Sequence, residues 1–276
     1  MMLKKIAVLG PGLLGGSVAL ACRDAGLDII LWGRREERVE ATRGLGLEAT
    51  TEISDAVQEA DLVILAVPVG AMPAVVEAMS PHLKSGVLVT DVGSVKMKVH
   101  QSVGESLKNL GVDFIGSHPM AGSEQTGVEA ARADLLQNAA CVLTNDSGSS
   151  RIEELKSFWL ALGCRVEELD AADHDRAVAR ISHFPHAMAV LTADVGLRTG
   201  DEANLAGGGF RDTSRVASGD PTMWAEIMVE NRDALLKVMI EAQDSLRDML
   251  VFLENSDEEG LQNYLAEVKT RRDQVS

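Results

Sequence analysis

The stretch KIAVLGPGLLGGS, residues 5–17, decides the fold of this chain of 276 residues. It starts with a short apolar run, which predicts a buried strand, and its glycines fit the pattern GxGxxG where a helix should begin. Gly10 permits a tight turn, Gly12 lets the backbone approach a pyrophosphate, and Gly15 lets helix and strand pack closely. The N-terminus of the following helix favours an anion. A purely structural glycine turn is the alternative, but the strand–turn–helix context indicates a nicotinamide dinucleotide bound by Gly10, Gly12, Leu13, Leu14 and Gly15.

Short apolar runs alternate with helix-like stretches from the start of the chain to about residue 170. We expect strands at residues 5–9, 28–32, 62–67, 87–91, 113–116, 141–144 and 165–169, and helices such as 15–25, 35–45 and 152–162. This alternation is typical of βαβ units that form a parallel sheet. Beyond it, the strand pattern ends and the sequence predicts helices alone. We therefore expect an α/β Rossmann-type dinucleotide-binding domain at residues 1–170, followed by an all-α domain at residues 171–276.

Two helices of the C-terminal part carry further expectations. Residues 175–197 should form one, which Pro185 should kink or break because proline lacks the backbone N–H. Asp220 and Pro221 suit the N-cap and the first position of another helix, which we expect to continue to about Leu253. A helix so long and so rich in apolar residues should pack against more than its own small domain. We infer a homodimer through the helical domain; the alternative is that this helix only covers the sheet domain.

The charge and composition of the chain exclude several classes of protein. Its 42 acidic and 26 basic residues give a net charge of -16, which repels nucleic-acid phosphates and anionic lipids. No apolar run reaches the length of a membrane span, and the apolar start runs into Gly10 without the cleavage site of a signal peptide. Cys22, Cys141 and Cys164 form no CxxC pair, which fits a reducing compartment. We expect a cytoplasmic protein that binds neither nucleic acid nor membrane.

The end of the second expected strand decides which dinucleotide fits. A site that prefers NAD usually has an acidic residue there, which binds the ribose 2′-hydroxyl. Asp28 lies at the opposite end of this strand, whereas Arg34 and Arg35 follow its carboxyl end. Arginines bind a 2′-phosphate through forked, charge-assisted hydrogen bonds, so we expect NADP, with NAD as the second choice. The alternative is that both arginines pair with neighbouring glutamates. Val67 and Pro68 end another strand and should pass beside the riboses.

Histidines, a serine and an arginine are the candidates for chemistry and substrate binding. His118 and Ser94 each follow an expected strand, so both should lie at the carboxyl edge of the sheet, where a histidine can accept a proton from an alcohol. His183 and His186 lie three residues apart on one helical face; a metal site with nearby acids is conceivable, but no known spacing supports one, and we expect none. Arg215, in a glycine-rich stretch of an acidic chain, should help to bind an anion. Structural roles are the alternative for each.

The order of these segments resembles that of the prephenate/arogenate dehydrogenases, the cyclohexadienyl dehydrogenases of tyrosine biosynthesis. The segments are the glycine turn, GSVK (93–96), HPMAGSE (118–124), SHFPH (182–186) and GFRDTSR (209–215). The resemblance spans nearly the whole chain, and its last four segments are far more specific than the glycine turn. It implies a dinucleotide-binding domain followed by an all-helical dimerisation domain. Since the first strand should begin by Leu3 and the last helix should end near Ser276, we expect neither a fused chorismate mutase nor a regulatory ACT domain.

The resemblance also implies a role for each candidate residue. His118 would accept the proton of the substrate's ring hydroxyl while hydride leaves the same carbon, and Ser94 would hold that hydroxyl or His118. Arg215 would bind a substrate carboxylate. The substrate pocket would further be lined by His183, His186, Glu124 and Trp224. The reaction would be the NAD(P)-dependent oxidative decarboxylation of prephenate to 4-hydroxyphenylpyruvate.

Three alternatives to this function stay open. Glu124 could pair with the ammonium group of arogenate, so the enzyme could be an arogenate dehydrogenase that makes tyrosine directly; a helix-capping role for Glu124 is equally open. Another two-domain reductase, such as a β-hydroxyacid dehydrogenase or an imine reductase, would depend on other loops or on a lysine that has no evident counterpart before Lys237. A dinucleotide-sensing protein without turnover would not need His118, Ser94 and Arg215 to converge.

Overall fold

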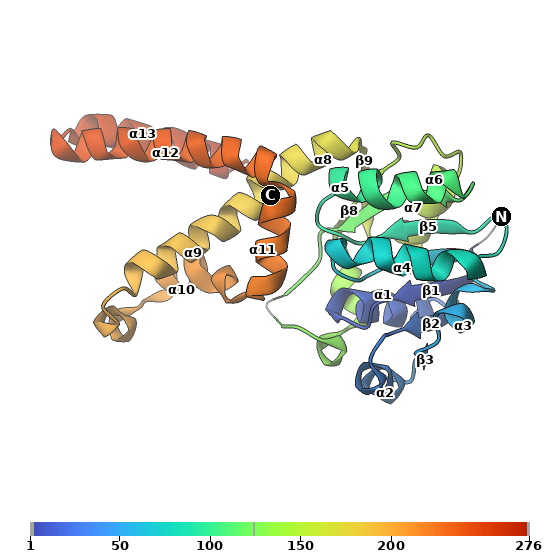
Figure 1. The fold of residues 1–276 in the computed structure, drawn as a ribbon. Helices are drawn as coiled ribbons and strands as arrows, with labels where there is room; N and C mark the ends of the chain where they lie inside the picture. Colours follow the sequence, from blue (N-terminus) through green and yellow to red (C-terminus); the bar gives the residue numbers. More distant parts are fainter. Residues whose placement is uncertain (1–2, 124, 275–276) are drawn as a thin grey trace. The chain divides into compact units, whose positions relative to one another are not determined.

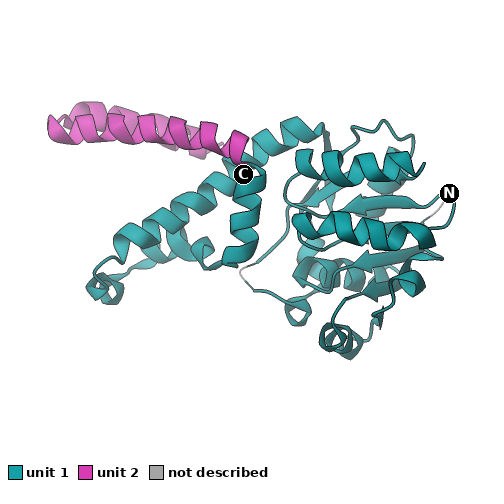
Figure 2. Cartoon of the chain, in the orientation of Figure 1, with its two compact units in different colours: residues 1–231 teal, residues 232–276 magenta. Residues whose placement is uncertain are grey.

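The computed structural model describes residues 3–123 and 125–274 (Figure 1). Its contacts divide the chain into two compact units, residues 1–231 and residues 232–276 (Figure 2). The first unit contains every strand of the described chain. It also contains all the described residues that the sequence predicts for a site. Glu124, which is predicted for the site as well, lies outside the described residues.

Six parallel strands form the main sheet of the first unit, in the order β3-β2-β1-β4-β5-β6 (Figure 1). They are β1 (Lys5–Leu9), β2 (Asp28–Trp32), β3 (Glu48–Thr50), β4 (Leu62–Leu65), β5 (Leu88–Asp91) and β6 (Asp113–Phe114). β1 lies inside the sheet, where Val8 pairs with Leu31 on one side and with Ile64 on the other. The strand order reverses between β1 and β4, which is the switch point of Rossmann-type folds. The expected fold class is confirmed.

The side chains of β1 alternate between two separate hydrophobic cores. Ile6 and Val8 belong to one core, and Ala7 and Leu9 belong to the other. Both faces of the sheet are buried because helices flank it, and this is why its strands read as continuous apolar runs. The helices between and after these strands are α1 (Leu13–Asp24), α2 (Glu36–Gly44), α3 (Ile53–Val57), α4 (Met72–Met79), α5 (Met97–Val99), α6 (Glu105–Asn109) and α7 (Ile152–Ala161).

The last three strands form a second, smaller sheet, which corrects the expectation of one parallel sheet. They are β7 (Gly116–Pro119), β8 (Ala140–Thr144) and β9 (Arg165–Leu169), and β7 runs antiparallel to β8. The N–H of Ile115 still donates to the backbone of Val89 in β5, whereas the N–H of Ser117 donates to the Asp91 side chain. The chain therefore leaves the main sheet between these residues. The sequence predicts no strand at β3, because three residues with Glu48 exposed make no apolar run.

The sequence predicts that Pro185 kinks or breaks its helix, and the break is wrong, because residues 171–196 remain helical past Pro185. α8 (Ala171–Val178) passes into a π-helical turn, η6 (Ala179–His183), and then into α9 (Phe184–Gly196). Pro185 is the second residue of α9 and directly follows the π-helical turn, a local change of helix type that accommodates a residue without a backbone N–H. Single π-helical turns are frequent at functional sites, and His183 ends this one.

Shorter helical elements connect the parts already described. α9 is followed by the short helix α10 (Gly208–Ser214). Helical turns of four or five residues occur at η3 (His100–Gly104), η5 (Ala133–Leu136), η7 (Asp201–Leu205) and η8 (Arg215–Ser218).

Asn231 ends the helix that begins at Pro221, so the expectation of one long helix to Leu253 is wrong. α11 (Pro221–Glu230) is capped as predicted by Asp220, which accepts a hydrogen bond from the Met223 N–H at 2.8 Å. At Asn231 the backbone leaves the helical region, with φ -106° and ψ 24°. The Asn231 side chain is buried and hydrogen-bonded within the first unit, and these bonds favour the interruption.

The second unit is a hairpin of two helices, α12 (Arg232–Glu254) and α13 (Glu258–Arg272), which lie side by side (Figure 2). Asp257 caps α13 by accepting a hydrogen bond from the Gly260 N–H at 2.9 Å. Large apolar side chains of α12 are exposed, among them Leu236, Ile240, Leu246, Leu250 and Leu253. None of the helices that the structure describes is long and apolar enough to cross a membrane.

Candidate active site

The turn between β1 and α1 has no room for a side chain at two of its glycines. Gly10 has a φ of +130°, which L-residues rarely adopt, and a Cβ there would lie 2.5 Å from the Ala66 carbonyl oxygen. A Cβ at Gly15 would lie 2.1 Å from the Gly10 carbonyl oxygen. The start of α1 therefore packs directly against the turn, which is the role that the motif gives its third glycine.

Gly12 differs from these two glycines, because no atom of the described residues lies within 4 Å of the position that its Cβ would take. It directly precedes α1, and among the residues that the structure describes no side chain caps the N-terminus of that helix. Free backbone N–H groups with open space beside them suit a pyrophosphate. The residues present thus fit a dinucleotide, whose phosphates the backbone of Leu13, Leu14 and Gly15 would hold.

Two further strand ends lie against this glycine turn. A Cβ at Gly33, directly after β2, would lie 2.7 Å from the Pro11 ring. A Cβ at Gly10 would lie 3.0 Å from the backbone nitrogen of Val67, at the end of β4. The pair Val67–Pro68 is therefore beside the turn, on the side where the strand order reverses. This is where the sequence predicts the riboses of the dinucleotide.

Arg34 and Arg35 follow Gly33 and are both exposed. Arg35 forms an ion pair with Glu37 in which the two charged atoms are 3.3 Å apart. That pair is one of the glutamate pairings that the sequence leaves open as an alternative to phosphate binding. The arginines are thus positioned near the dinucleotide site, and their preference for a 2′-phosphate stays a prediction.

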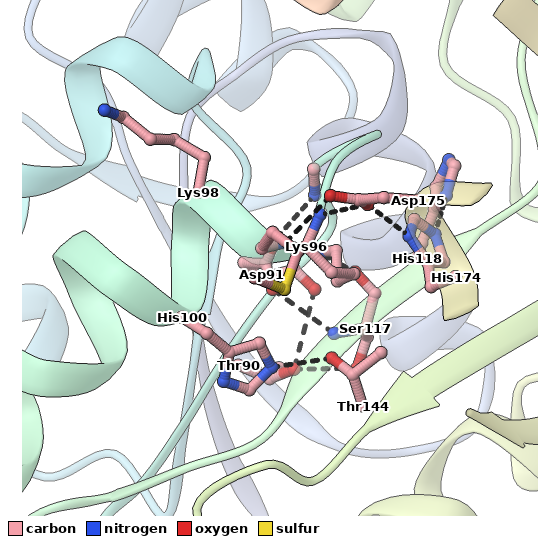
Figure 3. A network of polar contacts seen from close by, with 12 residues as sticks. Thr90, Asp91, Lys96, Lys98, His100, Ser117, His118, Thr144, His174 and Asp175 are labelled. Atoms are coloured by element: carbon pink, nitrogen blue, oxygen red, sulfur yellow. Dashed lines mark hydrogen bonds and ion pairs between the residues drawn. The ribbon is translucent and has the colours of Figure 1, made fainter. Parts of the chain in front are cut away.

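A buried ion pair holds the chain next to His118 (Figure 3). Lys96 and Asp91 are completely buried, and the Lys96 ammonium group bonds to the Asp91 carboxylate. Lys96 Nζ also donates to the Ser117 carbonyl oxygen at 2.8 Å, and the Ser117 N–H donates to Asp91 Oδ1 at 3.2 Å. Burial lowers the pKa of Lys96, and the Asp91 carboxylate opposes this effect. These bonds tie β7 to the end of β5, so His118 lies at the carboxyl edge of the main sheet.

His118 is buried against a second histidine. Its Nδ1 atom lies 2.8 Å from Nε2 of His174. Burial lowers the pKa of His118 well below the usual 6.5, and the nearby His174, Lys96 and His183 lower it further. His118 is therefore a neutral imidazole at neutral pH, as a proton acceptor must be.

Three of the four residues predicted for the wall of the substrate pocket, His183, His186 and Trp224, lie together. The rings of His186 and Trp224 stack with centroids 3.6 Å apart, and His183 meets the same indole edge-on at 6.3 Å. Within the described chain, His183 Nε2 and His186 Nδ1 are buried without a hydrogen-bond partner. Buried polar atoms of this kind call for a ligand or a water molecule. The cluster thus has the polar groups that a bound substrate could satisfy.

The structure is less informative about the other predicted site residues. Ser94 lies between β5 and α5, is half-buried, and makes no hydrogen bond through its hydroxyl with the residues described. Arg215 begins the turn η8, which packs against α9, and its side chain is exposed. Their roles toward a substrate stay predictions, as does that of Glu124, which lies outside the described residues.

Four residues of this site have no role in the sequence analysis: Asp91, Lys96, His174 and Asp175. The first pair had a signal, because an aspartate at the end of a buried, mainly apolar strand is itself buried and must find a partner. His174 and Asp175 are neighbours in α8, and nothing in their spacing indicates that they would meet His118.

Comparisons with protein families and with known proteins indicate the same class for this protein. Residues 18–168 match the family model described as prephenate dehydrogenase, nucleotide-binding domain. Residues 170–267 match the model described as prephenate dehydrogenase, dimerization domain. A cyclohexadienyl dehydrogenase from Zymomonas mobilis is 35% identical over 284 residues, which cover 98% of this chain and 95% of the relative.

Solved structures support the same conclusion. Prephenate dehydrogenase from Aquifex aeolicus, in complex with hydroxyphenyl propionate and NAD+, is 30% identical with a TM-score of 0.90, covering 100% of this chain and 99% of that one. Arogenate dehydrogenase from Synechocystis is 32% identical with a TM-score of 0.82, covering 98% and 99%. An imine reductase from Myxococcus stipitatus, at 16% identity and a TM-score of 0.56, shares the fold alone. This chain belongs to the prephenate dehydrogenase family, whose members are oxidoreductases that use a nicotinamide dinucleotide.

Proposed function

We propose that this protein converts prephenate to 4-hydroxyphenylpyruvate by oxidative decarboxylation, as a step of tyrosine biosynthesis. The observation that carries the proposal is the buried, neutral imidazole of His118 at the carboxyl edge of the main sheet. The glycine turn that fits a dinucleotide ends β1 at the same edge, because the strands are parallel. Membership of the family supports the choice of substrate class.

His118 is the proton acceptor in this proposal. Its neutral ring takes the proton of the substrate's ring hydroxyl while the carbon that bears the hydroxyl loses a hydride, and the C–O bond becomes a carbonyl. The dinucleotide, when bound, supplies the hydride acceptor. The ring carboxylate then leaves as CO2, its bonding electron pair enters the ring, and the carbonyl oxygen takes a proton to give the phenol. Because aromatisation makes the reaction favourable, the protein mainly supplies orientation, a proton acceptor and an anion clamp.

The remaining site residues bind and orient the substrate. Ser94 lies three residues after β5, its hydroxyl has no hydrogen-bond partner among the described residues, and it would hold the ring hydroxyl or His118. His183, His186 and Trp224 would form one wall of the pocket, where two unsatisfied ring nitrogens support contact with a polar ligand.

Arg215 would bind a carboxylate of the substrate, and its replacement tests this role. A hydrogen bond to a charged group contributes about 1.5–3 kcal/mol, so Arg215→Ala should raise the KM for prephenate roughly tenfold or more. The kcat should change less, since Arg215 contacts no reacting atom in this proposal. Arg211→Ala is the matched control, because Arg211 belongs to the same glycine-rich stretch and is also exposed. An unchanged KM in the Arg215 variant would argue against a carboxylate contact.

NADP is the cofactor that the end of β2 favours in this proposal. Arg34 is exposed beside the glycine turn, and the Arg35–Glu37 pair is exposed as well, with 60% and 71% of the side chains accessible. Exposed ion pairs contribute little, so Arg35 can exchange its glutamate for a phosphate. Michaelis constants for NADP and NAD test the choice. A clearly lower constant for NAD would contradict it.

Prephenate is the first choice of substrate, and arogenate is the second. Arogenate differs by an ammonium group in place of the keto group, and Glu124 could pair with that charge. Rates of dinucleotide reduction, followed by absorbance with prephenate and with arogenate as sole substrates, test the proposed function. Turnover of neither substrate would refute it. Equal or better efficiency with prephenate would count against arogenate as the preferred substrate.

We further infer a homodimer formed through the helical domain, residues 171–276, with residues 1–170 binding the cofactor. The exposed apolar side chains of α12 support this, as does the match of residues 170–267 to a dimerization domain. A cytoplasmic location is supported by three cysteines that are all buried and free. Light scattering of the purified protein tests the dimer, and a monomer at micromolar concentration would refute it.

A further inference from the structure

We infer that His174 and Asp175 are positioning residues that set the tautomer of His118 and leave the lone pair of His118 Nε2 available to the substrate hydroxyl. The inference deepens the proposed function, since it rests on His118 as the proton acceptor. Its main test nevertheless needs no substrate.

A continuous line of three buried side chains leads from His118 to a carboxylate (Figure 3). His118 Nδ1 lies 2.8 Å from His174 Nε2, and His174 Nδ1 lies 2.7 Å from Asp175 Oδ1. The relative exposure of the three residues is 7%, 0% and 5%. Because the line is buried, the partners within it, and not water, decide which ring nitrogen carries a proton.

Asp175 acts as an acceptor at every contact it makes here. Its Oδ1 accepts a hydrogen bond from the backbone N–H of Lys96 at 2.7 Å, and its Oδ2 accepts one from Met97 at 3.0 Å. A carboxylate oxygen has no proton to donate, so His174 Nδ1 is the donor in the bond to Asp175.

The other proton positions follow because both rings are neutral. Burial lowers the pKa of His174, and the hydrogen bond to Asp175 only partly opposes this. With its single proton on Nδ1, His174 has a lone pair on Nε2 and accepts a hydrogen bond from His118 Nδ1–H. His118 then has its own lone pair on Nε2, the nitrogen that a proton acceptor needs free. A carboxylate fixes the catalytic tautomer by the same logic in serine proteases, there through one ring instead of two.

Lys96 holds both ends of this line of side chains. The backbone of Lys96 donates to Asp175, and its ammonium group donates to the carbonyl of Ser117, the residue before His118. Asn231 donates to the Asp175 carbonyl oxygen at 2.8 Å and to His183 Nδ1 at 3.1 Å. The rings are thus held by elements from three parts of the first unit, so their orientation does not depend on α8 alone.

Nitrogen-15 NMR of the whole protein, labelled at histidine, reads the tautomer directly. In a neutral imidazole, the protonated nitrogen gives a pyrrole-type signal and the other a pyridine-type signal. We expect His118, assigned by the signals lost in His118→Asn, to have a pyrrole-type Nδ1 and a pyridine-type Nε2. A proton on Nε2 in the wild-type protein would overturn the inference, whether or not the protein oxidises prephenate.

Replacement of His174 tests the consequence for catalysis. His174→Phe keeps a ring but removes both nitrogens, so we expect kcat to fall on the order of 100-fold, with little change in the KM for prephenate and with loss of the pyridine-type Nε2 signal. His174→Gln should recover part of kcat, because its amide can accept from His118 and donate to Asp175. Unchanged kcat and an unchanged His118 spectrum in His174→Phe would refute the positioning role.

His100→Phe is the matched control. It also removes a 2.8 Å hydrogen bond of a largely buried histidine, here to Thr144, but one outside the line. Its kcat should stay within a few-fold of the wild type. Thermal unfolding and dinucleotide affinity report whether each variant is folded. Should His174→Phe not fold, the wild-type spectrum and His174→Gln decide the matter. Failure of the proposed function can be told apart from failure of this inference. In that case His118 would show the predicted tautomer, but the protein would oxidise neither prephenate nor arogenate.

Discussion

The glycine turn after β1 and the polar cluster around His118 lie at the same edge of the main sheet, yet they are built in opposite ways. The glycine turn offers backbone atoms to a ligand, and the space beside Gly12 is open because glycine has no side chain to fill it. The cluster is made of buried side chains, among them the wholly buried Lys96 and Asp91. The turn is one short stretch of chain that packs against the ends of β2 and β4, whereas the cluster is assembled from side chains of β5, β7 and α8 and of the loop that carries Lys96.

This difference predicts which kind of substitution damages each part. A turn made of backbone is damaged when atoms are added, because a Cβ meets the neighbouring chain or occupies space that a ligand needs. A buried polar cluster is damaged when atoms are removed, because a partner is then left buried without its bond. Four experiments can break or sharpen this comparison.

The largest effect should come from His118→Asn. Loss of the proton acceptor should lower kcat by roughly 10²- to 10⁴-fold, while the dissociation constant for the dinucleotide stays unchanged. Steady-state kinetics with prephenate and fluorescence titration with the dinucleotide measure the two quantities. His82→Asn, which changes an exposed histidine, is the control and should keep full activity. Retained turnover in the His118 variant would remove this residue as the proton acceptor.

Lys96→Met should give the largest loss of stability. It leaves the Asp91 carboxylate buried without its ion-pair partner, which should reduce the free energy of unfolding by about 3–5 kcal/mol. Urea unfolding measures the change. Lys98→Met is the control, because Lys98 is exposed and points away from the cluster (Figure 3), and it should change stability by less than about 0.5 kcal/mol. Equal stability of the two variants would show that the buried pair is not what holds the cluster.

The glycine turn should respond differently at two of its positions. In Gly15→Ala the added methyl meets the Gly10 carbonyl oxygen, so the free energy of unfolding should fall by about 1–3 kcal/mol. In Gly12→Ala the methyl meets no atom within the described part of the chain, so stability should stay the same while the KM for the dinucleotide rises. Urea unfolding and cofactor kinetics separate the two. A destabilised Gly12 variant with normal cofactor binding would mean that the open space does not serve the pyrophosphate.

The smallest effect should be on the pH dependence. Burial lowers the pKa of His183 to about 4, below the 6.5 of an exposed histidine. At pH values between these two, the unfolded chain binds a proton that the folded chain does not. The contribution of His183 to stability is therefore complete above pH 6.5 and is lost as the pH falls toward 4.

Urea unfolding across this pH range measures the loss. His183→Gln should flatten the dependence, and His82→Gln, at an exposed position, should leave it as in the wild type. The acid limb of kcat/KM should likewise lie below pH 6.5, since burial keeps His118 neutral. A limb at or above 6.5 would contradict a buried neutral acceptor.

Much of the fold could be predicted from the sequence because its signals are local. The strand–turn–helix at residues 5–17 and the helices α2 and α7 lie where the apolar pattern predicts them, within about two residues. The errors lie where distant contacts decide. Pro185 follows a π-helical turn in place of a break, and Asn231 interrupts a pattern that reads as one helix.

By itself, the sequence determined the Rossmann-type half, the position of the glycine turn and the family, since backbone conformation and apolar periodicity depend on neighbouring residues. It also singled out His118 as a candidate base. Only the tertiary structure decided what surrounds that base. The bonds from Lys96, His174 and Asp175 join residues that lie up to 79 positions apart, and burial makes them strong and selective. Which partner a buried side chain finds depends on how sheet and helix pack, and no local pattern in the chain specifies it.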